Sequence, residues 1–248
     1  MKKNQLVLLL SKENSYLVSV KKGKFHTKDG IFNLEELFKK NFGDRIKTHL
    51  GKEFIVVNPR ITDLLENIER LPQIVMPKDA ALILAYTGIG PGSLVVDAGT
   101  GSGYLALFLA NYVYPGKVIT YESNKKFAKI AIKNIKLIGL KNIKLKQKDI
   151  TKGIEEKNVD LITLDLKDAE KVVEHAYKAL KTGGWLVVYS PYIEQVSSVV
   201  KKMEEKGFCS IKTVENIVRE WQVEKYTRPK TLGLMHTGWL TFGRKVGK

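Results

Sequence analysis

The amino-acid sequence predicts an α/β protein in which a largely parallel sheet is covered by helices on both faces and preceded by a small β-rich domain. Two observations lead to this fold. From about residue 93 onward, short apolar runs alternate with helix-like runs, as in proteins whose parallel strands are joined by helical crossovers. Before residue 61 the chain has short β-rich runs separated by glycine and polar turns. We therefore predict a β-rich domain of residues 1–60 and a second domain of residues 61–248.

The first domain is expected to contain three strands and one helix. Asn33 is a suitable N-cap for this helix, Glu36 follows at the spacing of a capping box, and Gly43 would end it. The predicted strands are residues 6–10, 15–20 and 53–57.

The second domain begins with two predicted helices and continues with alternating strands and helices. Prolines bound the early helices, and apolar runs of strand length define the sheet. The predicted helices are residues 63–70, 79–87, 104–113, 124–138, 169–180 and 194–206. The predicted parallel strands are residues 93–97, 117–122, 143–149, 160–166 and 185–190. Two final runs, 210–218 and 231–242, lack a long helix between them and predict a closing hairpin with one antiparallel strand.

The composition is that of a folded protein with a polyanionic partner. Of the 248 residues, 44% are hydrophobic and 27% are charged, which excludes a disordered chain. The formal net charge is +16, and 36 of the 42 basic residues are lysine, so nucleic acid is a candidate partner. The single Cys209 excludes an intrachain disulfide, and no apolar run has the length of a membrane span. We expect a cytoplasmic protein without a membrane or metal partner.

A glycine-rich loop follows the first strand of the predicted sheet and opens the next helix. Asp97 ends the strand, and Gly99, Gly101 and Gly103 follow in a G-x-G-x-G pattern. Glycines at these positions permit a sharp turn and let a ligand approach the main chain. Tyr104 comes next, so the pattern is not the G-x-G-x-x-G of a dinucleotide site. An acidic strand end fits a ligand with a cationic amino group and no phosphate, such as S-adenosylmethionine.

Carboxylates also end the three following strands. The carboxyl ends of parallel strands meet at one edge of the sheet, beside the glycine loop. We expect Glu122 to accept hydrogen bonds from both ribose hydroxyls of the cofactor and Asp149 to accept one from its adenine amino group. Asp165 lies at the position that would face the methyl group.

At these residues the chain resembles the class I, Rossmann-like S-adenosylmethionine-dependent methyltransferases. More narrowly, it is similar to the TrmI family of tRNA (adenine-N1)-methyltransferases. Segments along nearly the whole chain carry this resemblance, and the Gln-Ile-Val and His-Thr-Gly sequences are more specific than the glycine loop. They are Phe25-His26-Thr27 with Gly30, Arg70 to Val75, Pro77 to Ala80, Tyr189-Ser190-Pro191, Gln195-Val196 and His236 to Phe242.

The resemblance implies methylation of N1 of adenosine in the T loop of tRNA, at position 58 and, in archaeal members, also at 57. It implies a homotetramer as well. Gln73 would line the methionine end of the cofactor, and Asp165 would be the catalytic carboxylate that also borders the cofactor. The other residues that would bind the cofactor, besides Asp97, Gly99 and Gly101, are Ser102, Gly103, Tyr104, Leu105, Glu122, Asp149 and Ile150. Lys167 and Asp168 depart from the family, whose members often have prolines after the catalytic Asp-Leu.

Other functions remain open at this point. Protein-isoaspartate and corrin-ring methyltransferases share the glycine loop, and a non-catalytic RNA-binding subunit would share the fold. The β-rich domain and the basic charge argue against the first two, and the intact carboxylates argue against the third. Trp221, Tyr226 and Trp239 are expected to pack in the core rather than to stack on bases. Two groups of lysines are candidates for phosphate contacts: Lys2, Lys3, Lys21, Lys22 and Lys24, and Lys133, Lys136, Lys141, Lys144, Lys146 and Lys148.

Overall fold

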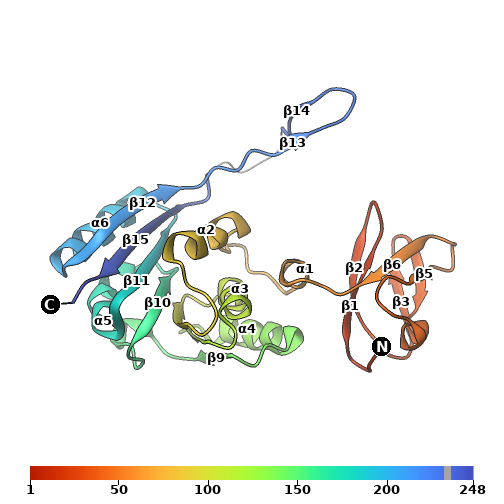
Figure 1. Cartoon of the computed structure of the whole chain (residues 1–248), viewed down its shortest axis with the longest axis horizontal. Helices are drawn as coiled ribbons and strands as arrows, with labels where there is room; N and C mark the ends of the chain where they lie inside the picture. Colours follow the sequence, from red (N-terminus) through yellow and green to blue (C-terminus); the bar gives the residue numbers. More distant parts are fainter. Residues whose placement is uncertain (232–235, 248) are drawn as a thin grey trace. The chain divides into compact units, whose positions relative to one another are not determined.

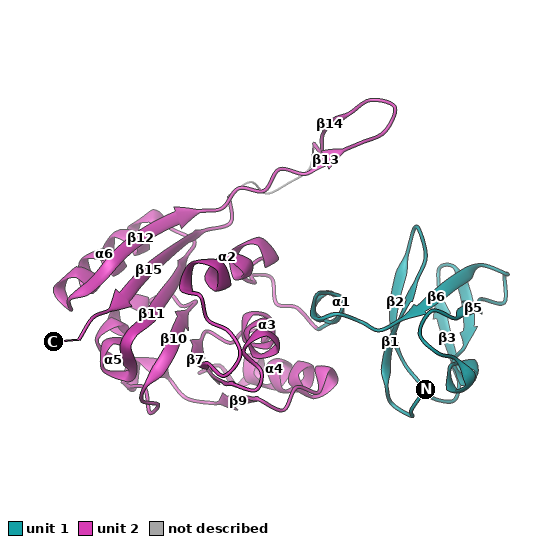
Figure 2. Cartoon of the chain, viewed as in Figure 1, with its two compact units in different colours: residues 1–68 teal, residues 69–248 magenta. Residues whose placement is uncertain are grey.

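The structure, a computed structural model, describes residues 1–231 and 236–247 (Figure 1). It divides into two compact units, Met1–Ile68 and Glu69–Lys248 (Figure 2). Helix α1 (Ile61–Glu66) belongs to the first unit, whereas the sequence analysis assigns its residues to the second domain. The predicted boundary between residues 60 and 61 stays a prediction. Every helix within the described ranges is too short or too polar to cross a membrane.

The first unit is built around a four-stranded antiparallel sheet. Its strand order is β2-β1-β6-β5, and β6 alternates exposed and buried side chains. Phe32, Leu37 and Phe54 are fully or nearly fully buried in its core. The strands are β1 (Leu6–Leu10), β2 (Ser15–Ser19), β5 (Arg45–Lys47) and β6 (Glu53–Val57), and a separate hairpin joins β3 (Lys24–Thr27) to β4 (Gly30–Asn33).

The predicted helix of the first unit is shorter and of a different type. It is the 3₁₀ helix η1 (Leu34–Lys39), and the Asn33 side chain accepts a hydrogen bond from the backbone N–H of Glu35 as its N-cap. Leu34 and Leu37 are both buried, and residues three apart lie on one face of a 3₁₀ helix. Burial of these two leucines therefore favours the tighter helix over the predicted α-helix.

The second unit contains a seven-stranded sheet of order β12-β15-β11-β10-β7-β8-β9. Strand β15 is antiparallel to both of its neighbours, and the other adjacent pairs are parallel. The prediction of a parallel sheet with one antiparallel strand near the C-terminal end of the chain is therefore confirmed. The strands are β7 (Leu94–Ala98), β8 (Lys117–Tyr121), β9 (Ile143–Lys146), β10 (Val159–Leu164), β11 (Leu180–Ser190), β12 (Phe208–Glu215) and β15 (Trp239–Lys245).

Helices cover both faces of this sheet, as predicted (Figure 1). Helices α5 and α6 pack against each other and against the β11 side of the sheet, whereas α3 packs against β7 and β8. The predicted helix 169–180 is divided into η3 (Ala169–Lys171) and α5 (Val173–Ala179). The remaining helices are α2 (Pro77–Thr87), α3 (Tyr104–Val113), α4 (Lys125–Ile138), η2 (Ile150–Lys152) and α6 (Ile193–Glu205).

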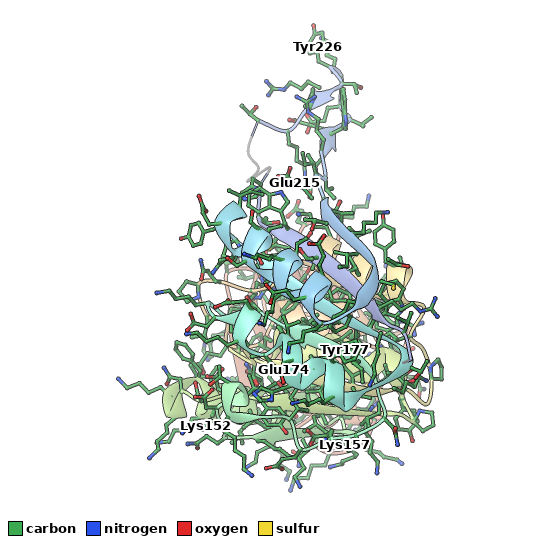
Figure 3. The ribbon with its side chains drawn as sticks, turned by 90° about the vertical axis from the view of Figure 1, so that its left-hand side faces the viewer. Lys152, Lys157, Glu174, Tyr177, Glu215 and Tyr226 are labelled. Atoms are coloured by element: carbon green, nitrogen blue, oxygen red, sulfur yellow. The ribbon has the colours of Figure 1, made fainter. Side chains whose placement is uncertain are left out.

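The connection between β12 and β15 extends away from the sheet (Figures 1 and 3). It contains a small hairpin of β13 (Trp221–Gln222) and β14 (Arg228–Pro229), and residues 232–235 of the predicted strand 231–242 lie outside the described residues. The expectation that Trp221 and Tyr226 pack in the core is wrong, because they are 54% and 75% exposed. Two-residue strands with no second layer over them cannot bury an aromatic ring.

A buried ionic network joins the start of α2 to the C-terminal strands. The Lys78 ammonium group lies 3.0 Å from the Asp79 carboxylate and donates to the Asn216 carbonyl oxygen and to the Thr237 hydroxyl. Thr237 in turn donates to Asp79 at 2.9 Å, and its carbonyl oxygen accepts from the Tyr189 hydroxyl. Residues distant in the sequence are thereby held at one place in the fold.

We expect Asp79→Asn to lower the free energy of unfolding by about 3 kcal/mol, because it leaves the largely buried side chain of Lys78 without a charged partner. Urea denaturation of both proteins measures this difference. Glu174→Gln is the control, because it interrupts only exposed ion pairs with Lys178 and Lys206 and should change stability by less than about 1 kcal/mol. Equal losses in the two variants would contradict a stabilising role for the buried network.

Candidate active site

A cavity of about 780 Å³ opens at the carboxyl ends of the parallel strands in the second unit. Its walls come from the loops that follow β7, β8, β9 and β10 and from the segment before α2. Seven of the predicted site residues line it: Gln73, Gly99, Gly101, Glu122, Asp149, Ile150 and Asp165. The strand order thus brings residues from four separate connections into one site.

The glycine loop has left-handed backbone at each of its three glycines, with φ between +55° and +86°. A Cβ atom on Gly99 would lie only 1.9 Å from the Asp165 carbonyl oxygen, whereas one on Gly101 would meet nothing closer than 3.8 Å. The Asp165 N–H also donates to the Ala98 carbonyl oxygen at 2.8 Å. Gly99 is therefore required by the close approach of the β7 and β10 ends, a reason that differs from the expected approach of a ligand.

Glu122 is held by the backbone on both sides of its carboxylate. Its Oε2 atom accepts from the Gly101 N–H at 2.9 Å, and its Oε1 atom accepts from the Asn124 N–H at 2.8 Å. Asn124 is itself the N-cap of α4. Because a carboxylate oxygen accepts more than one hydrogen bond, both oxygens retain acceptor capacity in the cavity.

Asp97 lies inside the sheet and is not among the residues that line the cavity. It is 2% exposed, and its two oxygens accept from the hydroxyls of Thr120 at 2.6 Å and Thr163 at 2.8 Å. Burial, and then the negative charge of Glu122, raise its pKa to about 6, although the two threonine hydrogen bonds lower it. A direct contact of Asp97 with a cationic amino group stays a prediction.

Asp165 follows β10 directly and lines the cavity. Its side chain has no hydrogen-bond partner in the part of the chain that the structure describes, and burial followed by the charge of Asp97 raises its pKa to about 7. An unpartnered acceptor in a cavity of this size is suited to bind a hydrogen-bond donor of a substrate.

The remaining predicted residues divide between the cavity wall and the packing behind it. Asp149 lies beyond the end of β9 rather than on it, and its Oδ1 atom accepts from the Thr151 N–H and hydroxyl as the N-cap of η2. These bonds lower its pKa. The residues that open α3 are buried behind the loop and do not line the cavity: Ser102, Gly103, Tyr104 and Leu105.

Several lining residues escaped the sequence analysis. Phe127 lies in the first turn of α4 and is 38% exposed. The sequence feature that could have predicted its place in the cavity is a large apolar side chain a few positions after a strand-end carboxylate. The connection after β10 contributes a charged group of residues. The lining residues to which the sequence assigned no role in cofactor binding or catalysis are Leu71, Pro72, Tyr121, Ser123, Phe127, Lys148, Thr151, Leu166, Lys167, Asp168 and Lys171.

Among the residues that the structure describes, no histidine lines this cavity. His236 is hydrogen-bonded through Nδ1 to Glu215 Oε1 at 2.6 Å and lies against the Trp239 ring, and His175 bonds the Thr151 carbonyl oxygen. Within the described ranges there is no group of His, Cys, Asp and Glu side chains arranged to hold a metal ion.

Comparison with known proteins identifies the family. Residues 65–238 match the family described as "tRNA methyltransferase complex GCD14 subunit". The chain belongs to this family. The GCD14 match includes the loops that line the cavity, together with the segment before α2 that contains Gln73.

Individual similar proteins and solved structures match nearly the whole chain. The TrmI protein of Methanocaldococcus jannaschii, named tRNA (adenine(57)-N(1)/adenine(58)-N(1))-methyltransferase, is 40% identical and covers 92% of this chain and 90% of its own length. The crystal structure of the tRNA (m1A58) methyltransferase TrmI from Aquifex aeolicus has a TM-score of 0.82 and 26% identity, covering 100% of this chain and 99% of that one. The crystal structure of an S-adenosylmethionine-dependent O-methyltransferase from Thermotoga maritima has a TM-score of 0.90 and 34% identity, and the match covers 100% of this chain and 95% of that one. The predicted family and the class I methyltransferase fold are both confirmed.

The polar lining of the cavity fits the cofactor of this fold. Glu122, Asp149 and Asp165 supply acceptor oxygens, and Gly101 leaves space where a Cβ atom would stand. S-adenosylmethionine offers ribose hydroxyls, two amino groups and a positive sulfonium, all of which are compatible with carboxylates.

Proposed function

We propose that this GCD14 family member transfers the methyl group of S-adenosylmethionine to N1 of adenosine in the T loop of tRNA, at position 58, with position 57 as a second candidate site. The observation that carries the proposal is the single cavity shared by Glu122, Asp149 and Asp165, in a chain 40% identical to an enzyme named for this reaction. The proposed cofactor residues are Gln73, Glu122, Asp149 and Ile150 with the glycine loop, and the proposed catalytic residue is Asp165.

The chemistry requires alignment more than proton transfer. N1 of adenine carries an in-plane lone pair at neutral pH, so no strong base is needed for attack on the methyl group. S-adenosylmethionine supplies an activated methyl group on a positively charged sulfur. Glu122, with both oxygens held by backbone N–H groups, would hold the ribose in one orientation, and such positioning supplies much of the acceleration.

Asp165 would bind the target base and stabilise the charge that develops on it. Methyl transfer moves positive charge onto the adenine ring, and a carboxylate that accepts from the exocyclic N6 amine lowers the energy of that state. Accepting from N6 also selects adenine over guanine. Because N1 lies inside the folded elbow of tRNA, the base would have to leave its stack to reach the cavity.

The proposal is tested by incubating the purified protein with S-adenosylmethionine and unmodified tRNA, digesting the RNA and identifying the methylated nucleosides by mass spectrometry. We expect 1-methyladenosine, at positions that primer extension maps. An O-methylated nucleoside would instead favour the O-methyltransferase activity for which the Thermotoga maritima protein is named. Cofactor binding without methylated tRNA would favour a small-molecule or protein substrate, and no cofactor binding would favour a non-catalytic RNA-binding subunit.

Glu122→Gln is expected to weaken S-adenosylmethionine binding about 10- to 100-fold. The amide nitrogen of glutamine would face one of the two backbone N–H groups, so the side chain would lose its orientation and one acceptor for the ribose. Isothermal titration calorimetry measures the affinity. The affinity for tRNA alone should stay unchanged, and a loss of both affinities would indicate misfolding rather than a cofactor contact.

We further propose a cytoplasmic homotetramer. Exposed apolar side chains in the extended β12–β15 connection support self-association: Ile217, Val218, Trp221, Val223 and Tyr226. Light scattering coupled to size exclusion measures the mass of the assembly.

A further inference from the structure

Three lysines line the cavity, and one of them has no carboxylate partner among the residues that the structure describes. Lys148 forms an ion pair with Glu155, and Lys171 lies 3.4 Å from the Asp168 carboxylate. Lys167 is exposed and lines the same cavity, but in the part of the chain that the structure describes its ammonium group makes no ion pair and no hydrogen bond. An unneutralised cation at the mouth of a binding cavity is a ready site for an anionic group.

The backbone at Lys167 is fixed beside the proposed catalytic carboxylate. Lys167 follows Asp165 by two residues, so their Cα atoms are at most about 7 Å apart. The Gln195 side chain, from α6, donates from Nε2 to the Lys167 carbonyl oxygen at 3.3 Å. The flexible four-carbon stem of Lys167 therefore begins at a restrained position next to Asp165.

The strand order places Lys167 on the flank of the site away from the proposed cofactor contacts. Gly101, Glu122 and Asp149 follow β7, β8 and β9, whereas Lys167 follows β10, on the opposite side of β7 from β8. An anion bound there belongs more readily to the second substrate than to the cofactor.

We propose that Lys167 binds a backbone phosphate of the nucleotide whose base faces Asp165. The inference rests on the proposed function, because a nucleotide of tRNA joins its base to a backbone phosphate through a single sugar. The base edge would meet the carboxylate of Asp165 while the phosphate meets the ammonium group of Lys167. One connection after β10 would thus bind both ends of the extruded nucleotide, and the phosphate contact would add affinity without reading sequence.

The test compares Lys167→Ala, Lys167→Arg and Lys157→Ala in steady-state tRNA methylation with the full-length protein. Lys157 is the matched control because it is exposed, has no ion pair within the described residues and precedes β10 at the opposite edge of the sheet (Figure 3). We expect Lys167→Ala to raise KM for tRNA about tenfold with kcat nearly unchanged. It should also reduce the slope of log affinity against log salt concentration by about 1. Lys167→Arg should restore KM, and Lys157→Ala should match the wild type.

Three other outcomes would overturn the inference. An unchanged KM in Lys167→Ala, with an active wild type, removes the phosphate contact while leaving the proposed function intact. A weaker affinity for S-adenosylmethionine, measured by calorimetry without tRNA, assigns Lys167 to the cofactor carboxylate instead. An equal rise of KM in Lys157→Ala indicates a general effect of net charge. An inactive wild type would refute the proposed function itself, so the two failures are distinguishable.

Discussion

Replacement of Asp165 by asparagine is expected to lower kcat for tRNA methylation about 10²- to 10³-fold while the protein still folds and binds S-adenosylmethionine. Asparagine has the same shape but carries no charge, so it loses the electrostatic stabilisation of the positively charged adenine. Single-turnover assays with enzyme in excess measure the chemical step, and calorimetry measures cofactor binding. Glu170→Gln is the control, because it removes one negative charge from the same β10–α5 connection outside the cavity lining. An unchanged rate in Asp165→Asn would remove this residue from the mechanism.

The raised pKa of Asp165 predicts a second effect of Asp165→Asn, on the pH dependence of activity and stability. Burial, followed by the charge of Asp97, raises the pKa to about 7, so the carboxylate gains its charge as the pH rises through 7, and kcat/KM should rise with it. The folded protein holds this proton more tightly than the unfolded chain, whose carboxyl titrates near 3.8. The wild type therefore loses stability between about pH 4 and pH 7, and Asp165→Asn avoids that loss. Calorimetric scans should show a higher Tm for the variant at pH 8 and equal values at pH 4, and the reverse order would contradict the assignment.

The site residues that sequence predicted best are those whose position follows from topology alone. Glu122 and Asp165 come directly after β8 and β10, and both line the cavity because parallel strands end at one edge. Asp149 lies in the cavity as well, although it comes after the end of β9 and caps a 3₁₀ helix.

The hydrogen-bond partners of Asp97 could not be predicted from its position along the strand. It is a strand residue, and in the ladder it stands opposite Thr120 on β8 and Thr163 on β10, whose hydroxyls take both of its oxygens. That pairing depends on the register of two strands distant in the sequence, which a local pattern does not determine.

The sequence also does not determine which lysines are available for phosphate contacts. Lys146 and Lys148 were grouped with candidate phosphate contacts, but both form ion pairs with Glu155, and Lys146 also pairs with Glu156. In the sequence Lys167 is only a departure from a family pattern, and the structure adds that its ammonium group has no carboxylate partner among the described residues. Net charge predicts an anionic partner, but the neighbours of each side chain decide which lysines are available to it.

Gly99→Ala should reduce kcat about 10²-fold or more and lower stability beyond the ordinary cost of its backbone conformation. Gly99 has φ +85°, and alanine in the left-handed region costs about 1–2 kcal/mol. In addition, its Cβ atom would lie 1.9 Å from the Asp165 carbonyl oxygen, so either the glycine loop or the end of β10 must move. Moving the proposed catalytic carboxylate by about 1 Å relative to the proposed cofactor-binding loop is enough for a loss of that size.

Gly88→Ala separates the two contributions to this loss. Gly88 is the C-cap of α2 with φ +66°, and a Cβ atom there would meet nothing within 4 Å. It should cost the same 1–2 kcal/mol of strain, measured by urea denaturation, while leaving methylation at the wild-type rate. If Gly99→Ala proved no worse than Gly88→Ala in stability and rate, the contact between the glycine loop and the Asp165 backbone would not be what requires glycine. A Gly99→Ala protein that binds S-adenosylmethionine normally but methylates slowly would instead place the displacement at the β10 end, beside the target base.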